Sequence, residues 1–415
     1  MGRDAPEDAR PRAAETAPGG GVGPLRAAPL APNVSLREQL YAAVRAAGRI
    51  SRAELARDLG VSPGSITPVA SDLICAGLLR EMEDLAPPSG RGRPPVTLGV
   101  APEAGHVAGV KLADRDLSAV LVDLAGTPLA QATAPRDPAD TSPEGAVAAI
   151  AALLDGLRAG VGAGAGRLLG VGVGLPGLVD HHARRLRWSP ILAGRDVDLG
   201  GALAARLGVP AAIDNDANCV TMAELWFGRG RALPDFAVVT VEHGVGMGLV
   251  VGHAPYRGAH GLGMELGHTC VEIDGAPCRC GRRGCLEAYV SDYALVREAG
   301  AVLRDPPPEV DAALDAMHAA AVAGDAGARA AFDRAGRYLA QGLADVANLF
   351  DPRRIILSGG RMRHDLLWSD AVIARMGALA LSDPPPVEVH AWDDLVWARG
   401  AAALALSEAT PGLLA

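Results

Sequence analysis

Aromatic residues are scarce in this 415-residue chain, at 3% of the total, so aliphatic side chains have to build most of its core. No run of 18 uninterrupted apolar residues occurs, and the N-terminal segment lacks the apolar stretch of a signal peptide. We therefore expect a cytoplasmic chain without membrane spans. Its length exceeds the size at which a single hydrophobic core stops growing, which predicts two or three domains.

Positive charge is also in short supply, because the formal net charge is -9 at pH 7. This balance argues against a protein that binds nucleic acid over its whole surface. The charge is nevertheless unevenly distributed. Residues 35–100 hold eight Arg and seven acidic residues, whereas the part of the chain beyond residue 100 carries most of the negative charge. Any contact with DNA is therefore expected to be local, within residues 35–100.

Cysteine is sparse, with six residues in the whole chain, yet Cys278, Cys280 and Cys285 fall within eight positions. This clustering indicates metal ligation in a reducing compartment rather than a disulfide framework. His268 can complete a tetrahedral zinc site, and four protein ligands would make that zinc structural. Cys270 could replace one of these ligands, although a core thiol is its expected role. The alternative is that the three clustered thiols are unrelated.

Hydrophobic periodicity is absent from residues 1–34, which are rich in Pro, Gly and Ala, and we predict that they are disordered. Apolar residues then recur at helical spacing. A second helix is predicted from about Arg52 to Leu59 with Ser51 as its N-cap, and a third has Pro63 at its first position. A Pro- and Gly-rich stretch at residues 87–95 follows and is predicted to form a linker or a wing.

The second and third predicted helices carry the pattern of a helix-turn-helix. Ala56 is a small residue where the two helices cross, and Gly60 tolerates the positive φ that the turn needs. The apolar residues at the remaining contact positions are Leu55, Leu59, Val61, Ile66 and Val69. We therefore predict a winged helix-turn-helix DNA-binding domain at residues 35–100. An ordinary helical hairpin is the alternative.

Arginines flank this unit, and its third helix offers only short hydroxyl side chains. We expect the arginines to neutralise phosphates and the hydroxyls to meet base edges. The predicted DNA-contacting residues are Arg49, Arg52, Ser65, Thr67, Ser71, Arg91 and Arg93. Pro68 is expected to kink the third helix, so base readout should be weak, with dimerisation and DNA shape supplying more of the specificity. Residues 90–94 fit an arm in an A·T-rich minor groove, with a flexible linker as the alternative.

Short buried strands alternate with helices beyond residue 101. The strand candidates are residues 107–110, 119–124, 169–173, 211–213, 237–241 and 355–357, and the helix candidates are residues 144–157 and 339–350. A glycine-rich segment at residues 244–248 lies between two strand-like runs. This alternation predicts an α/β domain over residues 101–410.

Several motifs in this domain occur together. The sequence is Glu-Leu-Gly-His at residues 265–268 and Cys-x-Cys-Gly-x2-Gly-Cys-Leu-Glu at residues 278–287. Further motifs are Gly-Leu-Pro-Gly-Leu-Val-Asp at 174–180, Asp-Asn-Asp-Ala-Asn at 214–218 and Ser-Gly-Gly at 358–360. Together they resemble the ROK family (repressors, open reading frames and sugar kinases), specifically its repressor branch, over roughly residues 35–410. The resemblance implies an actin-like ATPase fold of the ribonuclease-H-like type, with two lobes and a sugar between them.

The resemblance also implies roles for five residues. Asn215 and Asp216 would bind sugar hydroxyls, with Asp216 as the general base in kinase members. Glu265, His268 and Glu287 would bind further hydroxyls, and His268 would also ligate zinc, together with Cys278, Cys280 and Cys285. Taken without the resemblance, Asp216 is equally an Asp that caps a helix, and the two glutamates are surface acids.

The chain departs from the kinase pattern on the nucleotide side. ROK kinases carry a glycine turn, Asp-x-Gly-Gly-Thr, whose backbone cradles phosphates, but the turn within residues 109–117 has neither glycine nor threonine. In the second phosphate loop Glu242 and His243 replace Gly-Thr, and Glu242 brings negative charge. On the sugar side, Met264 is bulkier than the usual Gly. These departures predict a sensor without kinase activity.

The expected function is that of a sugar-responsive transcriptional regulator, a repressor. It would bind operator DNA as a homodimer or homotetramer, and a sugar or sugar phosphate in the cleft would control its affinity for DNA. The first alternative is an ATP-dependent, glucokinase-like sugar kinase with an appended helix-turn-helix. The second is a regulator whose ligand is another protein, docking on the loop that carries Arg279, Arg282 and Arg283.

Overall fold

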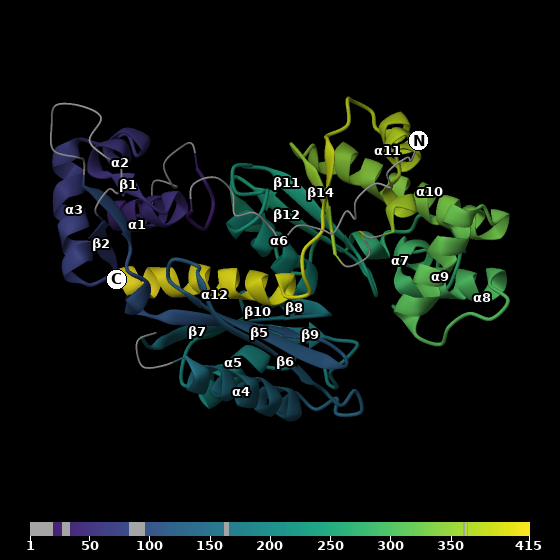
Figure 1. The fold of residues 1–415 in the computed structure, drawn as a ribbon, viewed down its shortest axis with the longest axis horizontal. Helices are drawn as coiled ribbons and strands as arrows, with labels where there is room; N and C mark the ends of the chain where they lie inside the picture. Colours follow the sequence, from purple (N-terminus) through teal and green to yellow (C-terminus); the bar gives the residue numbers. More distant parts are fainter. Residues whose placement is uncertain (1–19, 27–33, 83–95, 162–165, 360–361, 363) are drawn as a thin grey trace, which may run out of the picture.

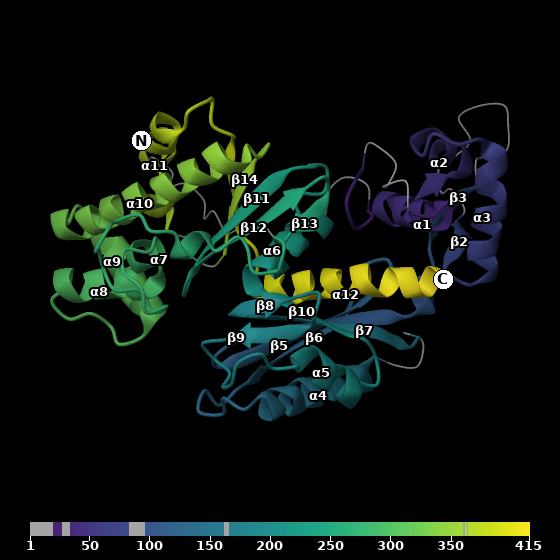
Figure 2. The same cartoon turned by 180° about the vertical axis from the view of Figure 1, so that it is seen from behind.

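The computed structural model describes residues 20–26, 34–82, 96–161, 166–359, 362 and 364–415. Figure 1 shows an N-terminal helical unit beside a larger body with two β-sheets. The C-terminal helix runs along the body, and its end lies next to the N-terminal unit (Figures 1 and 2).

The N-terminal unit consists of three helices and a small sheet. The helices are α1 (Leu36–Ala47), α2 (Arg52–Asp58) and α3 (Pro63–Cys75), and the strands, in the order β1-β3-β2, are β1 (Ile50–Ser51), β3 (Thr97–Val100) and β2 (Leu79–Met82). Ser35, Ser51 and Ser62 cap the three helices through their side chains, as expected for residues that compensate free backbone N–H groups. The turn between α2 and α3 passes through Gly60 at φ 65°, the conformation predicted for it.

Helix α3 continues through Pro68 to Cys75. Pro68 lacks the N–H that would bond to Gly64, yet the apolar face of α3 remains buried at Ile66, Ala70 and Leu73. Tertiary packing of this face therefore maintains the helix across the missing bond. The proline- and arginine-rich stretch that contains Arg91 and Arg93 lies outside the described residues.

The body contains two five-stranded sheets with the same strand order. The first is β10-β7-β4-β5-β6, with β10 (Ala211–Asn215), β7 (Leu168–Leu175), β4 (His106–Leu112), β5 (Asp116–Asp123) and β6 (Pro128–Pro135). The second is β13-β12-β11-β14-β15, with β13 (Ala254–Tyr256), β12 (Val245–Val251), β11 (Phe236–Val241), β14 (Ile355–Ser358) and β15 (Val387–His390). In the first sheet β4, β5 and β6 pair antiparallel, and β7 and β10 extend the sheet in parallel. In the second sheet β11, β12 and β13 pair antiparallel, and β14 and β15 extend it in parallel.

Helices cover the outer face of each sheet. Helices α4 (Pro143–Gly160) and α5 (Leu199–Leu207) lie on the first sheet (Figure 1). The second lobe carries α7 (Glu287–Val290), α8 (Asp292–Val302), α9 (Val310–Ala323), α10 (Ala326–Phe350) and α11 (Asp370–Leu379). A two-stranded hairpin of β8 (Leu178–Asp180) and β9 (Arg185–Trp188) projects from the first lobe.

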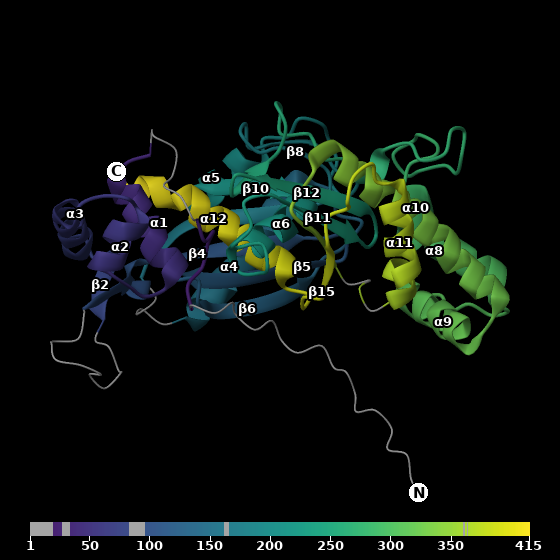
Figure 3. The same ribbon diagram turned by 90° about the horizontal axis from the view of Figure 1, so that it is seen from above.

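Two helices occupy the space between the sheets. Helix α6 (Asp216–Trp226) contacts β12 of the second sheet, and α12 (Val396–Leu414) lies across β4 and β7 of the first, as Figures 1 and 3 show. Glycines allow this close approach, because a Cβ added at Gly172 would lie 1.9 Å from the carbonyl oxygen of Ala401. The α6–α12 contact has the same origin, since a Cβ at Gly400 would lie 1.7 Å from the carbonyl oxygen of Cys219.

Residues 20–26 depart from the predicted disorder of the N-terminal tail. Within this segment the N–H groups of Val22, Gly23 and Leu25 donate to the carbonyls of Arg45, Trp226 and Arg231. The prediction for residues 1–34 is therefore wrong for residues 20–26, because these backbone groups find partners on the folded body; residues 1–19 and 27–33 lie outside the described part.

A search of the described helices finds none that is both long enough and apolar enough to span a bilayer.

Candidate functional site

The first group of candidate residues lies where strand β10 meets helix α6. Asn215 ends β10 and caps α6, accepting a bond from the Ala217 N–H at 2.8 Å, and its side-chain amide donates to the carbonyl of Gly177 at 2.9 Å. Asp216 is the first residue of α6, so its carboxylate lies at the positive end of the helix dipole. The strand end and the cap together fix both side chains at the edge of the first sheet.

Beneath these two residues lies a buried ion pair that the sequence did not reveal. Asp214 is 1% exposed and accepts two bonds from the Arg257 guanidinium, at 2.6 and 2.7 Å. It also accepts from the side-chain amide of Asn218 at 2.8 Å, and His181 lies 3.8 Å away. Arg257 follows β13 in the second lobe, so the pair joins the two lobes next to Asn215. No local pattern around Arg257 marks it, because its partner is 43 residues earlier in the chain.

Three carboxylates meet in this region. Loss of water raises the pKa of Asp216 above its usual value; the ammonium of Lys111 opposes this shift and the carboxylate of Glu287 adds to it. Glu265 keeps an exposed edge, yet the surrounding protein, together with Asp216 and Glu287, raises its pKa to about 7. The structure thus brings together the three acids that the motifs single out. Lys111 supplies a counter-charge, and its Nζ lies 3.8 Å from the centre of the Trp397 ring.

The residue before Glu265 has a backbone conformation that is unusual for a non-glycine residue. Met264 adopts φ 70°, a left-handed conformation that glycine adopts readily and other residues rarely do. Its side chain packs at the edge of the second core. Met264, which stands where the ROK pattern has Gly, therefore places a bulky side chain in a glycine conformation directly before Glu265.

Glu287 connects the carboxylate group to the cysteine cluster. It begins helix α7, is 9% exposed, and accepts from the Val245 N–H at 3.3 Å. Its other oxygen lies 3.6 Å from Sγ of Cys278.

The four predicted metal ligands converge. The ligand atoms of His268, Cys278, Cys280 and Cys285 all lie within 4.8 Å of one another. Nδ1 of His268 is 3.8 Å from Sγ of Cys278, and the sulfurs of Cys280 and Cys285 are 3.7 Å apart. A tetrahedral ion with sulfurs at about 2.3 Å separates them by about 3.8 Å, so these residues fit a metal of this kind.

Cys270 is outside this group. The structure leaves it exposed, so the expectation of a core thiol is wrong. Its backbone forms an isolated antiparallel bridge with that of Cys285, yet Cys270 is exposed whereas Cys285 is buried. It serves below as a matched control for the ligating cysteines.

The turn between β4 and β5, where a kinase would cradle phosphate, is bound by an arginine instead. Arg136 is 9% exposed and donates to the carbonyls of Ala113 at 3.4 Å and Asp114 at 3.2 Å. It also reaches the carbonyl of Ile191 at 3.3 Å. The guanidinium therefore ties this glycine-free turn to neighbouring loops.

The second departure from the kinase pattern also has a structural counterpart. The side chain of Glu242 lies against Gly359, since a Cβ added there would be 3.1 Å from Cγ and Oε1 of Glu242. His243 pairs with Asp292 at 2.7 Å. The loop after β11 thus brings the carboxylate of Glu242 to Gly359, which suits a nucleotide poorly because like charges repel.

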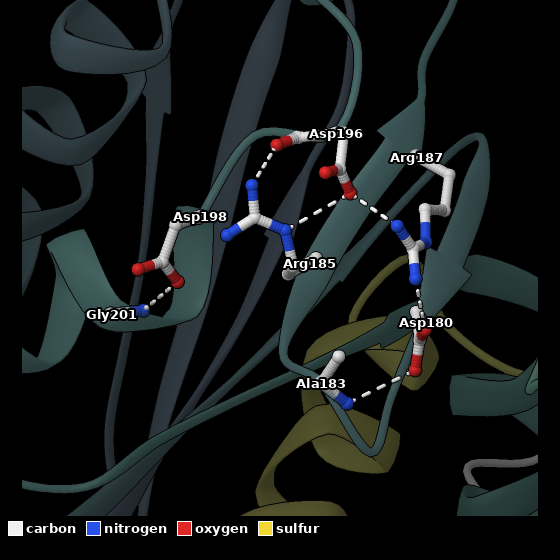
Figure 4. Close-up of polar contacts among 7 residues, drawn as sticks. All are labelled: Asp180, Ala183, Arg185, Arg187, Asp196, Asp198 and Gly201. Carbon is white, nitrogen blue, oxygen red and sulfur yellow. Dashed lines mark hydrogen bonds and ion pairs between the residues drawn. The ribbon is translucent and has the colours of Figure 1, made fainter.

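An ion-pair network holds the β8–β9 hairpin next to the site (Figure 4). Asp196 accepts from both Arg185 and Arg187, and Arg187 also binds Asp180 at 2.7 Å. Exposed pairs of this kind contribute little singly, so their effect is chiefly to fix the hairpin geometry. The hairpin follows Gly177, whose carbonyl positions Asn215.

The predicted DNA contacts differ in their availability. Arg49, Thr67 and Ser71 are exposed, and Thr67 bonds back to the carbonyl of Pro63. Ser65 is half-buried and shares a bond with Ser62 at 2.9 Å. Arg52 pairs with Glu81 of β2 at 2.8 Å, which reduces its positive field. Arg91 and Arg93 lie outside the described residues.

Two like sheets with α6 and α12 between them are the fold of the actin-like kinases. A model of the ROK family matches residues 99–408, and the chain belongs to this family.

The similar proteins include regulators as well as kinases. The DNA-binding transcriptional dual regulator NagC of Escherichia coli is 28% identical over 84% of this chain and 87% of its own. The crystal structure of a ROK family transcriptional regulator, a homolog of the E. coli MLC protein, superposes with a TM-score of 0.77 at 25% identity and covers 91% of this chain and 96% of its own. A ROK family glucokinase from Streptomyces griseus has a TM-score of 0.62 at 30% identity and covers 72% of this chain but 99% of its own.

These coverages differ over the N-terminal unit. Residues 99–415 make up about three quarters of the chain, so a match over 91% must extend into the residues before them. The glucokinase is matched almost completely by 72% of the chain.

Proposed function

We propose that this chain is a sugar-responsive transcriptional repressor that binds operator DNA through residues 35–100. The observation that carries the proposal is the N-terminal unit, which the regulator match includes and the glucokinase match does not require. Exposed Arg49, Thr67 and Ser71 would face DNA, with Arg91 and Arg93 adding phosphate contacts. Since DNA operators are commonly two-fold symmetric, the working form would be a homodimer or homotetramer.

The ligand would be a sugar or sugar phosphate at the cleft-side end of α6. Asn215, Asp216, Glu265 and Glu287 offer amide and carboxylate oxygens that accept bonds from sugar hydroxyls. His268 faces Cys278 through Nδ1, so its Nε2 would remain available to the ligand. Residues 101–410 would form the two-lobed sensor.

The metal would be a structural zinc. Three thiolates and one imidazole are the ligands zinc prefers, and a closed set of four leaves no position for catalysis. The ion would fix the loop that carries Glu265 and Glu287, and therefore the shape of the sugar site.

The proposal is tested by measuring DNA affinity with and without sugars. The probe is a duplex that the full chain selects from a randomised pool, titrated in the presence of glucose, N-acetylglucosamine and xylose, each free and phosphorylated. We expect at least one sugar to change the Kd tenfold or more, equivalent to about 1.4 kcal/mol. Unchanged affinity across the panel would reject sugar control.

A sugar kinase is the second candidate, because Asp216 is retained at the start of α6. Two features oppose it: Arg136 is bonded to the β4–β5 turn, and Glu242 lies near Gly359, both where a kinase would hold its nucleotide. A coupled kinase assay with ATP and the same sugars decides between the two candidates. If the wild type phosphorylates a sugar and Asp216→Asn does not, the chain is a sugar kinase as well as a repressor.

A further inference from the structure

The side chain of Arg45 is buried where the N-terminal unit meets the body. It extends from helix α1 and is 6% exposed, and its guanidinium lies 4.4 Å from the centre of the Trp226 ring at the end of α6. It donates to the hydroxyl of Thr410 in α12 at 2.8 Å. One side chain of the candidate DNA-binding unit therefore contacts both helices that lie between the sheets.

Each of these helices reaches the candidate sugar site. Helix α6 begins at Asp216 and ends at Trp226, and its 11 residues span about 16 Å. Helix α12 carries Glu408, two positions before Thr410, and Glu408 lies 3.4 Å from His181, which neighbours Asp214. A shift at the sugar end of either helix would be delivered to Arg45, because helices move largely as rigid bodies.

A backbone segment closes this junction from the N-terminal side. Residues 20–26 pass between α1 and the end of α6, with Gly23 bonded to Trp226 and Val22 bonded to Arg45. Arg231, 3% exposed, donates to the carbonyls of Gly23 and Ala46, at 2.9 and 2.6 Å, and so holds the segment and α1 together. We call residues 20–26 the strap.

In the described structure the guanidinium of Arg45 contacts the rings of Trp226 and Tyr41 and the hydroxyl of Thr410. Among the described residues its Nε has no hydrogen-bond partner, and burial lowers its pKa to about 10. A buried cation depends strongly on the groups that remain around it, so small movements of Trp226 or Thr410 change the stability of the junction. A purely structural contact of this size would more simply be apolar.

We propose that Arg45 is the residue that couples the sugar site to the DNA-binding unit, with α6 and α12 as the moving elements and the strap as the part that keeps them in contact. This inference rests on the proposed function. It adds the path by which one site senses the other, and by linkage the coupling must act in both directions.

The test adds DNA and measures the response at the sugar end of α6, so the sugar itself need not be known. Hydrogen exchange of residues 213–220, the sugar end of α6, is measured in the full chain with and without the selected duplex. Three chains are compared: wild type, Arg45→Met, and the control Arg57→Met, which removes an arginine of α2 whose only ion pair in the described structure is with its neighbour Asp58. Methionine keeps the volume of Arg45 without its charge.

In the wild type and in Arg57→Met we expect DNA to slow exchange of residues 213–220 at least threefold. In Arg45→Met this response should vanish while the DNA Kd stays within threefold. A response retained in Arg45→Met, or absent from the wild type, overturns the proposal.

Should Arg45→Met fail to fold, a chain lacking residues 1–26 replaces it. Losing the strap is expected to reduce the response by at least half, and an unaltered response would again overturn the proposal. A sugar panel without effect on DNA would instead reject the proposed function alone.

Discussion

At the residue scale, Asp216 combines a fixed position with an unfavourable charge environment. Its carboxylate is fixed at the start of α6, close to Glu287, in surroundings that raise its pKa. Lys111 and the helix N-terminus offset only part of this. The site therefore keeps a carboxylate that destabilises the free protein, which is the pattern expected of a ligand-binding group.

Asp216→Asn is expected to raise the melting temperature and to weaken sugar binding tenfold or more. Because the folded-state pKa is raised, the wild type loses stability as the pH rises from the usual value of 3.8. The stability advantage of the amide variant should therefore grow over this window and level off above the raised pKa. Melting curves at several pH values and sugar titration by calorimetry measure both effects; Asp114→Asn, in an exposed turn, is the control.

Arg49 and Arg52 should differ in their contribution to DNA binding. Arg49 is exposed, whereas Arg52 is paired with Glu81. Arg49→Ala should reduce the slope of log Kd against log salt by about 0.9, the value for one phosphate contact. The change in Arg52→Ala should be smaller, since the pair already neutralises part of its charge. A titration series in salt, with Arg206→Ala on distant α5 as the control, compares them; equal slopes for Arg49→Ala and wild type would exclude the contact.

At the scale of elements, the approach of α12 to the first sheet sets the spacing of the lobes. Gly172 leaves no space for a side chain against Ala401. We expect Gly172→Val to lower the free energy of unfolding by about 3 kcal/mol or more, because overpacking has to move a helix. Gly156→Ala on the exposed face of α4, where a Cβ meets nothing within 4 Å, should raise it by about 0.5–1 kcal/mol. Denaturant unfolding of the two variants tests the contrast.

The cysteine cluster acts on the loop between β13 and α7. Cys280→Ser is expected to remove bound metal and to weaken sugar binding about tenfold, within the range for lost metal-site support, since Glu265 and Glu287 lie on either side of the cluster. Cys270→Ser should change neither property, because Cys270 is outside the ligand set. Measuring the metal content and the sugar affinity of both variants tests this prediction. Equal metal content in both would contradict Cys280 as a ligand.

At the scale of the molecule, the candidate sugar site and the N-terminal unit are far apart in the sequence but contact the same two helices. Helices α6 and α12 start near the candidate ligand residues or pass them, and both meet α1 at Arg45. Under the proposal, this architecture would let a ligand at the candidate sugar site act on the attached N-terminal unit. Both a transcriptional regulator and a glucokinase of the family are similar to this body.

Local signals in the sequence were sufficient for many elements. Serine before each N-terminal helix, with Glu38 and Glu54 completing capping boxes, fixed the start of α1 and α2. The buried strands were predicted for the same reason, because an apolar run is a property of neighbouring residues. The candidate metal ligands could be picked out because the three cysteines lie on one short loop and His268 lies close before it.

Other features required contacts between distant residues. Arg257, Arg136 and Arg45 read as ordinary arginines until the fold places each in a buried position beside a partner from another element. The strap follows the same rule, since its backbone groups are paired only because α1 and α6 meet beside it. The sequence by itself therefore determined many of the elements, the family and the candidate metal ligands, all set by neighbouring residues. The tertiary structure alone decided which buried charges meet and how the two ends of the molecule are joined, because those depend on burial and on pairings that no local pattern encodes.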